Sequence, residues 1–307
     1  MINATKHPIR RLLQVNVFLA RAYYHYRLHR ESLQHSGPPV LIYQMGKVGS
    51  KTIRKSLRDL NLDMSIHHVH FLAPDRIEKI EKDRRKYLGT EKVGLLKHVW
   101  LYQYLAKQIA RGLSDKKWKV VTLTREPVAR NISTFFENLD VEPLDAGQRY
   151  RIQSDYYGFE TVLRMEDLDE LIHLFFAKLY HDRPLQFFDE EIRAVFGIDV
   201  FSSEFPIARG YNIYEGERAD VLLIRLEDLN DCAADAFKGF LNIDGFTLLD
   251  TNVGSQKGYA PIYTKFKDSI ALPESYLERM YTSKYARHFY SEEEIARFRA
   301  RWSRTEN

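Results

Sequence analysis

Short apolar runs alternate with amphipathic, charge-rich stretches along the first half of the chain. The apolar runs have the length of buried strands, and the stretches between them repeat apolar residues at helical spacing. The predicted strands are 40–44, 64–71, 92–98 and 119–124. The predicted helices are 51–60, 74–87, 100–112 and 128–137. Strands that alternate with helices indicate a parallel sheet flanked by helices, so we predict an α/β fold.

The pattern changes in the second half, where helical spacing becomes more frequent. The predicted elements are mostly helices over 140–200, turns at 211–220, a strand at 221–225, a helix from Glu227, a polar loop at 250–267 and helices at 274–287 and 291–302. We therefore predict a single α/β domain over residues 37–307, with a helical insertion at about 140–210 and a helical C-terminus.

Composition narrows the class of protein. The chain has 307 residues, of which 44% are hydrophobic and 29% charged, and these proportions exclude a disordered chain. A single cysteine, Cys232, excludes an internal disulfide framework and argues against a cysteine-based zinc site. The sequence has no uninterrupted apolar run of the roughly 20 residues that a membrane helix needs. We therefore expect a cytoplasmic protein without a metal.

The charge is concentrated at the N-terminus. The chain carries a net charge of +4, while residues 1–36 hold six Lys and Arg against one Glu. The remaining residues are therefore close to neutral, which argues against a nucleic-acid partner. We predict that residues 1–36 form a basic amphipathic segment. A helix docked on its own domain is the simpler interpretation, and a peripheral contact with the inner face of a membrane or with another protein is the alternative.

The first predicted strand runs into a glycine-containing loop and then a helix. In an open α/β sheet, ligands bind at such a loop, where backbone N–H groups and the helix N-terminus attract anions. Lysines and hydroxyl side chains strengthen this preference, and the glycines permit a close backbone approach. The candidate ligand-binding residues are Gly46, Lys47, Val48, Gly49, Ser50, Lys51 and Thr52.

A magnesium–ATP site is the first alternative for this loop. The ATP-type loop G-x-x-x-x-G-K-[ST] would place its glycines on Met45 and Ser50, and neither is glycine. The predicted strands also lack a convincing terminal aspartate for magnesium. A phosphotransferase or kinase is therefore disfavoured.

A second candidate anion site follows the strand at 119–124. Arg125 stands at the end of that strand, Pro127 suits the first turn of a helix, and Ser133 lies two turns further on. An arginine fork and a hydroxyl together make a phosphate clamp. The alternative is that Arg125 pairs with Glu126 or caps a helix.

The loop resembles the 5′-phosphosulfate loop of sulfotransferases that use 3′-phosphoadenosine 5′-phosphosulfate (PAPS). Lys47, Gly49, Ser50 and Thr52 stand where that loop has its lysine, glycine and hydroxyl residues. The resemblance implies a P-loop-type parallel sheet, PAPS as the co-substrate and Lys47 as the catalytic lysine.

The segment after Thr124 resembles the R-D-P-x-x-R-x-x-S element of the same superfamily. It matches at Arg125, Pro127, Arg130 and Ser133, with Glu126 in place of the aspartate. The resemblance implies that Arg125 and Ser133 hold the 3′-phosphate of PAPS. Two anion sites at two strand ends suit a donor that is phosphorylated at both the 3′ and 5′ positions.

Two later segments are similar to the superfamily more weakly. Residues 224–229 resemble its R-x-E-D-L strand end, and the loop 252–267, with Lys257, takes the place of its late basic loop. From about residue 40 to residue 302, the chain resembles bacterial sulfotransferase-like proteins of capsular polysaccharide synthesis. That resemblance implies a carbohydrate acceptor.

The expected reaction is in-line transfer of a sulfuryl group from PAPS to a carbohydrate hydroxyl, which needs a base but no metal. His98 is the first candidate for the base, because its H-V-W-L context, ahead of the Arg125 strand, resembles uronyl 2-O-sulfotransferases. His70 is the second candidate and Glu137 the third. The alternatives are a magnesium–ATP phosphotransferase and a catalytically silent nucleotide-binding protein of this fold.

Overall fold

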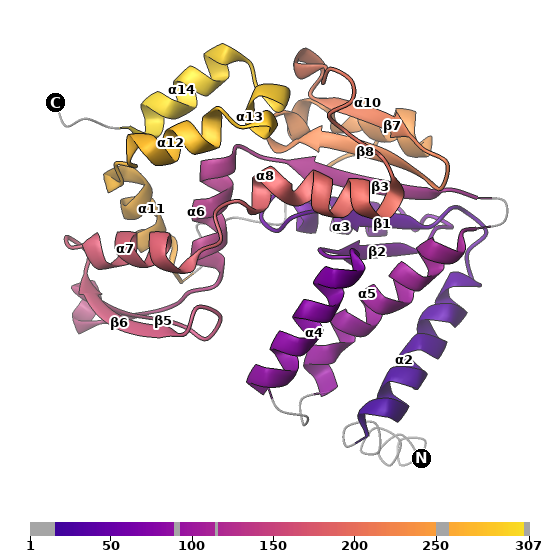
Figure 1. The fold of residues 1–307 in the computed structure, drawn as a ribbon, viewed down its shortest axis with the longest axis horizontal. Helices are drawn as coiled ribbons and strands as arrows, with labels where there is room; N and C mark the ends of the chain where they lie inside the picture. Colours follow the sequence, from indigo (N-terminus) through magenta and orange to yellow (C-terminus); the bar gives the residue numbers. More distant parts are fainter. Residues whose placement is uncertain (1–15, 89–92, 114–115, 250–257, 304–307) are drawn as a thin grey trace.

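The structure, a computed structural model, describes residues 16–88, 93–113, 116–249 and 258–303 (Figure 1). Its strands are β1 (Val40–Tyr43), β2 (Ile66–Val69), β3 (Trp118–Thr124), β4 (Asp140–Leu144), β5 (Arg149–Ser154), β6 (Phe159–Arg164), β7 (Tyr211–Glu215) and β8 (Ala219–Arg225). Its helices are α2 (Val17–Ser32), α3 (Ser50–Asp59), α4 (Pro74–Leu88), α5 (Val93–Arg111), α6 (Pro127–Glu137), α7 (Asp169–Lys178), α8 (Arg183–Phe187), α9 (Ala194–Phe196), α10 (Leu229–Leu241), α11 (Ala260–Ser269), α12 (Glu274–Tyr281), α13 (Lys284–Phe289) and α14 (Glu292–Trp302).

The main sheet of the described residues has five strands in the order β2-β1-β3-β8-β7. The first four strands of that order are parallel, and β7 joins β8 as an antiparallel edge strand. The predicted α/β class with a mostly parallel sheet flanked by helices is therefore confirmed. The turns predicted over 211–220 were wrong in part, because β7 occupies 211–215 and only the hairpin to β8 turns. Tyr211 and Tyr214 are buried in this strand.

The chain changes direction across the sheet at β1. From β1 the chain passes through α3 to β2 on one side, then through α4 and α5 to β3 on the other side of β1. Connections that leave neighbouring parallel strands in opposite directions open a crevice at the carboxyl ends of those strands. The ends of β1 and β3 are thus the expected place for a ligand.

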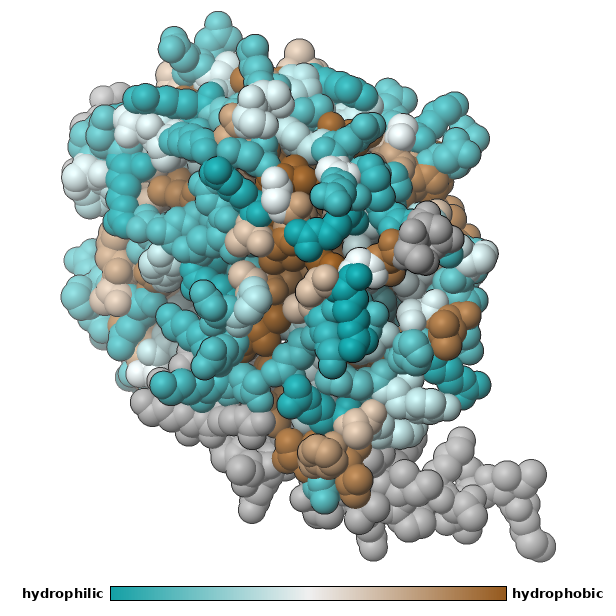
Figure 2. All heavy atoms as spheres, turned by 45° about the vertical axis from the view of Figure 1, so that its right-hand side comes forward, coloured by the Kyte–Doolittle hydropathy of each residue, from teal (hydrophilic) through white to brown (hydrophobic). Residues whose placement is uncertain are grey.

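The N-terminal helix α2 lies along α5, at the side of the sheet drawn on the right in Figure 1 and turned forward in Figure 2. Its buried residues Ala20 and Leu28 face the domain, and the Tyr24 and Trp100 rings lie 6.1 Å apart. The predicted docking of this segment on its own domain is thus observed for 16–32, while residues 1–15 lie outside the described residues. No helix among those described is long and apolar enough to cross a membrane.

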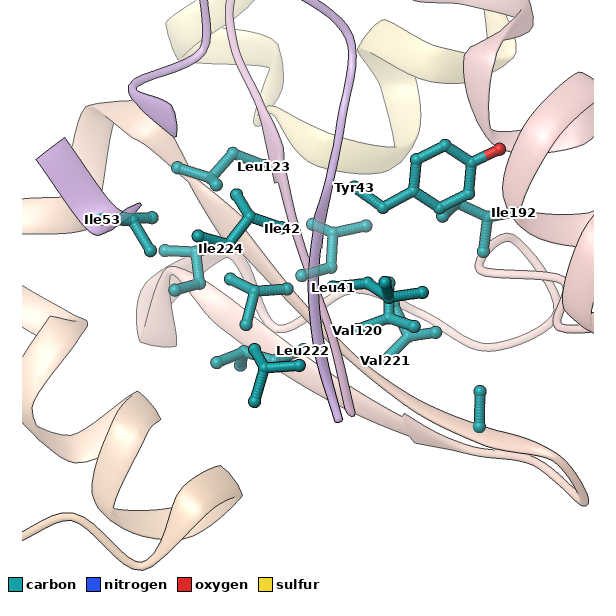
Figure 3. Packing of buried hydrophobic residues seen from close by; sticks show 14 of the residues in the cluster. Leu41, Ile42, Tyr43, Ile53, Val120, Leu123, Ile192, Val221, Leu222 and Ile224 are labelled. Atoms are coloured by element: carbon teal, nitrogen blue, oxygen red, sulfur yellow. The ribbon is translucent and has the colours of Figure 1, made fainter. Parts of the chain in front are cut away.

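Buried aliphatic side chains cover both faces of the main sheet (Figure 3). Ile42 of β1, Leu123 of β3 and Ile224 of β8 point to the face that α3 covers through Ile53. Tyr43 points to the opposite face. This alternation in β1, where all four residues are buried, explains why the strand sequence is continuously apolar.

The strand predicted at 92–98 was wrong, because these residues belong to α5. Leu96, Val99 and Trp100 are buried while Lys97 and His98 are exposed, which is the i, i+3, i+4 pattern of a helix. The run is short, and its apolar residues Val93, Leu95 and Leu96 lie close together in the sequence, so periodicity alone was ambiguous. The helix predicted from residue 100 begins earlier, at Val93.

The start of the predicted helical insertion was also wrong. Residues 140–164 form a three-stranded antiparallel sheet, β4-β5-β6, and helices follow from α7. In β5, Tyr150, Ile152 and Ser154 are buried and the residues between them are exposed. This strict period of two is the mark of a half-buried strand.

The C-terminal third differs from its predicted form in two places. The helix predicted at 274–287 is divided into α12 and α13, because Ser283 caps α13 by accepting a bond from the Ala286 N–H at 3.2 Å. The loop predicted at 250–267 ends in α11, which begins at Ala260. Residues 250–257, with the predicted ligand residue Lys257, lie outside the described residues.

Candidate active site

One cavity of about 360 Å³ lies at the carboxyl ends of β1 and β3. It is lined by Lys47, Gly49, Ser50, Lys51, Thr52, Arg125, Ser133, Glu137, Leu226, Tyr259 and Tyr263. The fold thus brings the loop after β1 and the segment after β3 to one pocket, although they are about 80 residues apart in the sequence. Gly46 and Val48 are not among its described lining residues, and the side chain of Val48 is buried in the core.

The loop after β1 has an unusual backbone. Lys47 has a φ of 72°, and Gly49, the N-cap of α3, has a φ of 92°. A Cβ atom on Gly49 would lie 2.8 Å from Leu226 Cδ1, so the position needs glycine for both its backbone angle and its contact. The cap has no side chain, and the first N–H groups of a helix have no acceptor inside it. This arrangement favours an anion at the start of α3.

Two arginines from the segment after β3 hold this loop. The Arg125 Nη1 donates to the carbonyl oxygen of Lys47 at 2.9 Å, and the Arg130 Nε donates to that of Gly46 at 3.2 Å. Arg130 is only 4% exposed. Burial, with the charge of Arg183, lowers the pKa of Arg130 to about 10, so the buried guanidinium still carries its charge at neutral pH. The loop therefore contacts the positive charges of Arg125 and Arg130 in addition to carrying those of its own lysines.

Glu126, which replaces the aspartate of the resembling element, caps α6. Its carboxylate accepts bonds from the N–H groups of Val128 and Ala129 at 2.8 and 2.7 Å and from the Tyr281 hydroxyl at 2.6 Å. Burial raises the pKa of this carboxyl. The Glu126 side chain, although longer than that of aspartate, thus still caps α6. Arg125 donates to the carbonyl oxygen of Lys47.

Glu137 supplies a carboxylate to the pocket. Its Oε2 lies 3.0 Å from Lys47 Nζ and accepts a bond from the Tyr259 hydroxyl at 3.0 Å, while its Oε1 lies 3.4 Å from Lys51 Nζ. Lys51 is largely exposed, but the side chains of Lys47 and Glu137 are 20% and 31% exposed. These donors are the ones that an incoming anion would use, so the carboxylate and such a ligand would compete for them.

The histidine candidates lie on the other side of the loop, toward β2. His70 Nδ1 is 2.8 Å from the Gln44 carbonyl oxygen, and the His70 ring stands 4.6 Å from that of His68. Burial lowers the pKa of both imidazoles, for His68 to about 3, and the nearby charge of His98 lowers both further. His98 is exposed on α5. Neither His70 nor His98 is among the described residues that line the pocket.

Three pocket residues were missing from the residues proposed from sequence: Leu226, Tyr259 and Tyr263. Leu226 lies directly after β8, in the segment that resembles the R-x-E-D-L strand end. Its place in that segment is the sequence feature that could have identified it as a pocket residue. The tyrosines belong to the Lys- and Tyr-rich stretch before and within α11, whose approach to α6 depends on tertiary packing. Tyr263 and Phe136 have ring centroids 5.1 Å apart.

The described residues contain no group of three or more His, Cys, Asp or Glu side chains placed to hold a metal ion. The charged groups that line the pocket are lysines, an arginine and one carboxylate. Such a set is suited to binding an anionic ligand.

A protein family described as "Putative capsular polysaccharide synthesis protein" matches residues 161–291 of the chain. The matched segment runs from β6 to the residue before α14 and includes Leu226, Tyr259 and Tyr263. The match covers less than half of the chain. It includes neither the loop at 46–52 nor Arg125 and Ser133. No curated protein and no solved structure matches the chain.

Proposed function

We propose that this protein is a sulfotransferase that moves a sulfuryl group from PAPS to a hydroxyl of a carbohydrate. The observation that carries the proposal is the shared pocket of the loop after β1 and the segment after β3. Lys47 and Lys51 line it from the loop after β1, and Arg125 and Ser133 line it from the segment after β3. A donor with phosphates at both its 3′ and 5′ positions has a use for both segments, whereas ATP has no 3′-phosphate.

In the proposed reaction, the acceptor oxygen attacks the sulfur of PAPS and the bond from that sulfur to the 5′-phosphate oxygen breaks. Negative charge builds up on the leaving phosphate, and Lys47 would stabilise it together with the N-terminus of α3. The Lys47 ammonium must first separate from the Glu137 carboxylate before it contacts the donor. Arg125, which also fixes the Lys47 carbonyl, and Ser133 would hold the 3′-phosphate.

The acceptor hydroxyl must also lose a proton. We propose His98 as the base, with His70 and Glu137 as the second and third candidates. The interaction of His70 Nδ1 with the Gln44 carbonyl fits a neutral ring whose Nε2 has a free lone pair. Glu137 is the one candidate of the three that lines the described pocket, but its carboxylate is engaged by two lysines.

The carbohydrate acceptor rests on the description of the matching family, capsular polysaccharide synthesis. A polysaccharide presents many hydroxyl groups, and sulfation of one of them would be a modification step in its synthesis. The pocket opens beside Tyr259, which also lines a neighbouring cavity of about 390 Å³ over β4 and β5. An extended acceptor has room along that surface.

Calorimetry on the purified chain tests the donor. We expect 3′-phosphoadenosine 5′-phosphate to bind without magnesium and ATP to bind weakly, with or without magnesium. Magnesium-dependent ATP binding would replace the proposal with a phosphotransferase. Tight binding of the bisphosphate, with no sulfated product from any saccharide offered with PAPS, would support a catalytically silent nucleotide-binding protein.

The base is tested by turnover. We expect the His98→Ala variant to lose turnover while it keeps its affinity for the bisphosphate, because the imidazole acts only on the acceptor. His70→Ala and Glu137→Ala, measured in parallel, rank the other two candidates. A fully active His98→Ala variant would remove His98 from the mechanism.

A further inference from the structure

The helix α2 also carries large apolar side chains that are exposed to solvent. Its inner face, with Ala20, Tyr24 and Leu28, lies against α5 and the core. With 3.6 residues per turn, Phe18, Leu19, Tyr23 and Tyr26 fall on the opposite side of the helix, and Leu33 continues that side at its C-terminal end. This outer face consists of Phe18, Leu19, Tyr23, Tyr26 and Leu33, and we call it the outer face of α2.

The outer face is well exposed. Phe18 is 78% exposed, Leu33 74% and Tyr26 61%. These three account for much of the exposure of large hydrophobic side chains in the described part of the chain. Figure 2 turns this side forward and shows hydrophobic side chains at the surface among hydrophilic ones toward its lower end. A group of large exposed apolar side chains on one helix is typical of a surface that meets a partner.

Positive charge borders the outer face. The same helical geometry places Arg30 within the face, between Leu19 and Tyr23, and places Arg21 and Arg27 on the two flanks between the outer and inner faces. The helix has a single acidic residue, Glu31. Along the Arg21 flank, α2 and α5 enclose a cleft of about 370 Å³. It is lined by His25, Tyr26, His29, Tyr104, Lys107, Gln108 and Arg111, with no carboxylate among these described residues.

The charges gather at this cleft. Burial lowers the pKa of the His25 imidazole, and the charges of Arg21 and Lys107 lower it further, so both cations stand close to the cleft. Lys107 and Arg111 are four residues apart on α5 and therefore project from the same side of that helix. A phosphate group of an anionic lipid is small enough for the cleft and opposite to it in charge.

We propose that the outer face of α2 and the adjoining α2–α5 cleft bind the protein peripherally to an anionic bilayer. Aromatic and aliphatic side chains would enter the interfacial layer while the arginines and lysines meet lipid phosphates. A soluble polyanion would use the cations alone and leave the apolar side chains in water. The exposed Phe18, Tyr26 and Leu33 therefore favour the bilayer.

Co-sedimentation of the full chain with vesicles tests the proposal. One set of vesicles is phosphatidylcholine alone, and in the other about a third of the lipid is phosphatidylglycerol. We expect binding to the second set only, weakened by high salt. The Lys107→Ala/Arg111→Ala variant should bind about 30-fold more weakly, since each cation near a charged surface contributes about a fivefold factor. The Phe18→Ser/Tyr26→Ser variant should lose about tenfold.

Matched controls come from elements other than α2 and α5. Tyr156→Ser/Tyr180→Ser removes two aromatic side chains that are 76% and 53% exposed, and Lys178→Ala/Lys238→Ala removes two exposed lysines. Both controls should bind vesicles like the unmodified chain, and all variants should keep its melting temperature. The proposal would be overturned by equal binding to neutral vesicles or by equal losses in the controls. It would also be overturned, in favour of a polyanion site, if Phe18→Ser/Tyr26→Ser bound fully and heparin competed with the vesicles.

Discussion

The Nζ atom of Lys47 lies 3.0 Å from the Oε2 atom of Glu137, so the lysine that is proposed to stabilise the leaving group is already paired with a carboxylate. Lys51 and the Tyr259 hydroxyl contact the same carboxylate. The pocket therefore contains an internal anion at the place where the proposed donor brings its own. A phosphate that binds there replaces the Glu137 carboxylate as the partner of Lys47. The measured affinity is therefore the difference between the free energies of these two interactions.

Replacing Glu137 by Gln should tighten binding of 3′-phosphoadenosine 5′-phosphate by about fivefold, because a partly buried ion pair worth about 1 kcal/mol no longer competes. Isothermal titration calorimetry at low salt measures the change. The matched control is Glu142→Gln, which removes an exposed carboxylate of β4 outside this pocket. Weaker binding by Glu137→Gln would mean that the carboxylate helps to hold the ligand rather than competing with it.

Ser133→Ala and Arg125→Ala should both weaken binding of the bisphosphate. A hydrogen bond to a charged group is worth about 1.5–3 kcal/mol, or roughly 10- to 150-fold in the dissociation constant. The larger loss is expected for Arg125→Ala, because Arg125 also holds the Lys47 carbonyl at 2.9 Å. Thr134→Ala is the control, since that hydroxyl donates to the Arg130 carbonyl within α6. Unchanged affinity in both pocket variants would remove the proposed 3′-phosphate site.

Gly49→Ala should lower both stability and ligand affinity. The residue has a φ of 92°, and a Cβ atom would meet Leu226 Cδ1 at 2.8 Å. The expected loss is about 1–3 kcal/mol of unfolding free energy, measured by urea denaturation. Gly46→Ala is the control, because no atom lies within 4 Å of a Cβ at that position. The double variant Gly49→Ala/Leu226→Ala should recover only the part due to the contact.

Stability should fall in acid through the buried histidines. Burial lowers the pKa values of His67, His70 and His181, and that of His68 to about 3. A base with a lower pKa in the folded state contributes stability above its unfolded value of 6.5, and this contribution is lost as the pH falls. From about pH 7 to about pH 4, the melting temperature of His68→Gln should therefore fall less than that of the unmodified chain.

The acid sensitivity is measured as a difference between variants, because other buried groups change the stability in the opposite direction as the pH falls. Burial raises the pKa values of Glu126 and Glu227, so their contribution to stability decreases as the pH rises through their folded values. His29→Gln, at an exposed position on α2, is the control and should follow the unmodified chain. If His68→Gln also follows it, the buried imidazole is not a source of the acid sensitivity.

Much of the site could be predicted because it depends on short segments. The residues from 46 to 52 combine glycine, lysine and hydroxyl side chains between a strand and a helix, and Arg125 and Ser133 stand at fixed places after the next parallel strand. Backbone preference and helical spacing act within a few residues, so a sequence reveals them directly. Eight of the residues proposed from sequence, Glu137 included, line the same cavity. Their roles in binding PAPS stay predictions.

Other features depended on contacts between distant segments. The segment 92–98 could be a buried strand or a helix by its composition, and packing of Leu96, Val99 and Trp100 decided for the helix. The approach of Tyr259 to Glu137 joins positions that are 122 residues apart, and no local pattern indicates it. The same is true of His70 and His98, which lie near each other but outside the described lining of the pocket.

By itself, the sequence determined the α/β class, the glycine- and lysine-containing loop after β1 and the arginine–serine segment after β3. The tertiary structure decided which strands are neighbours, where the chain changes direction across the sheet, and that Glu137 meets both lysines of the loop. It also decided which face of α2 is buried and which is left exposed. The physical reason is that conformational preferences are local, whereas burial and charge pairing depend on segments that only the folded chain brings together.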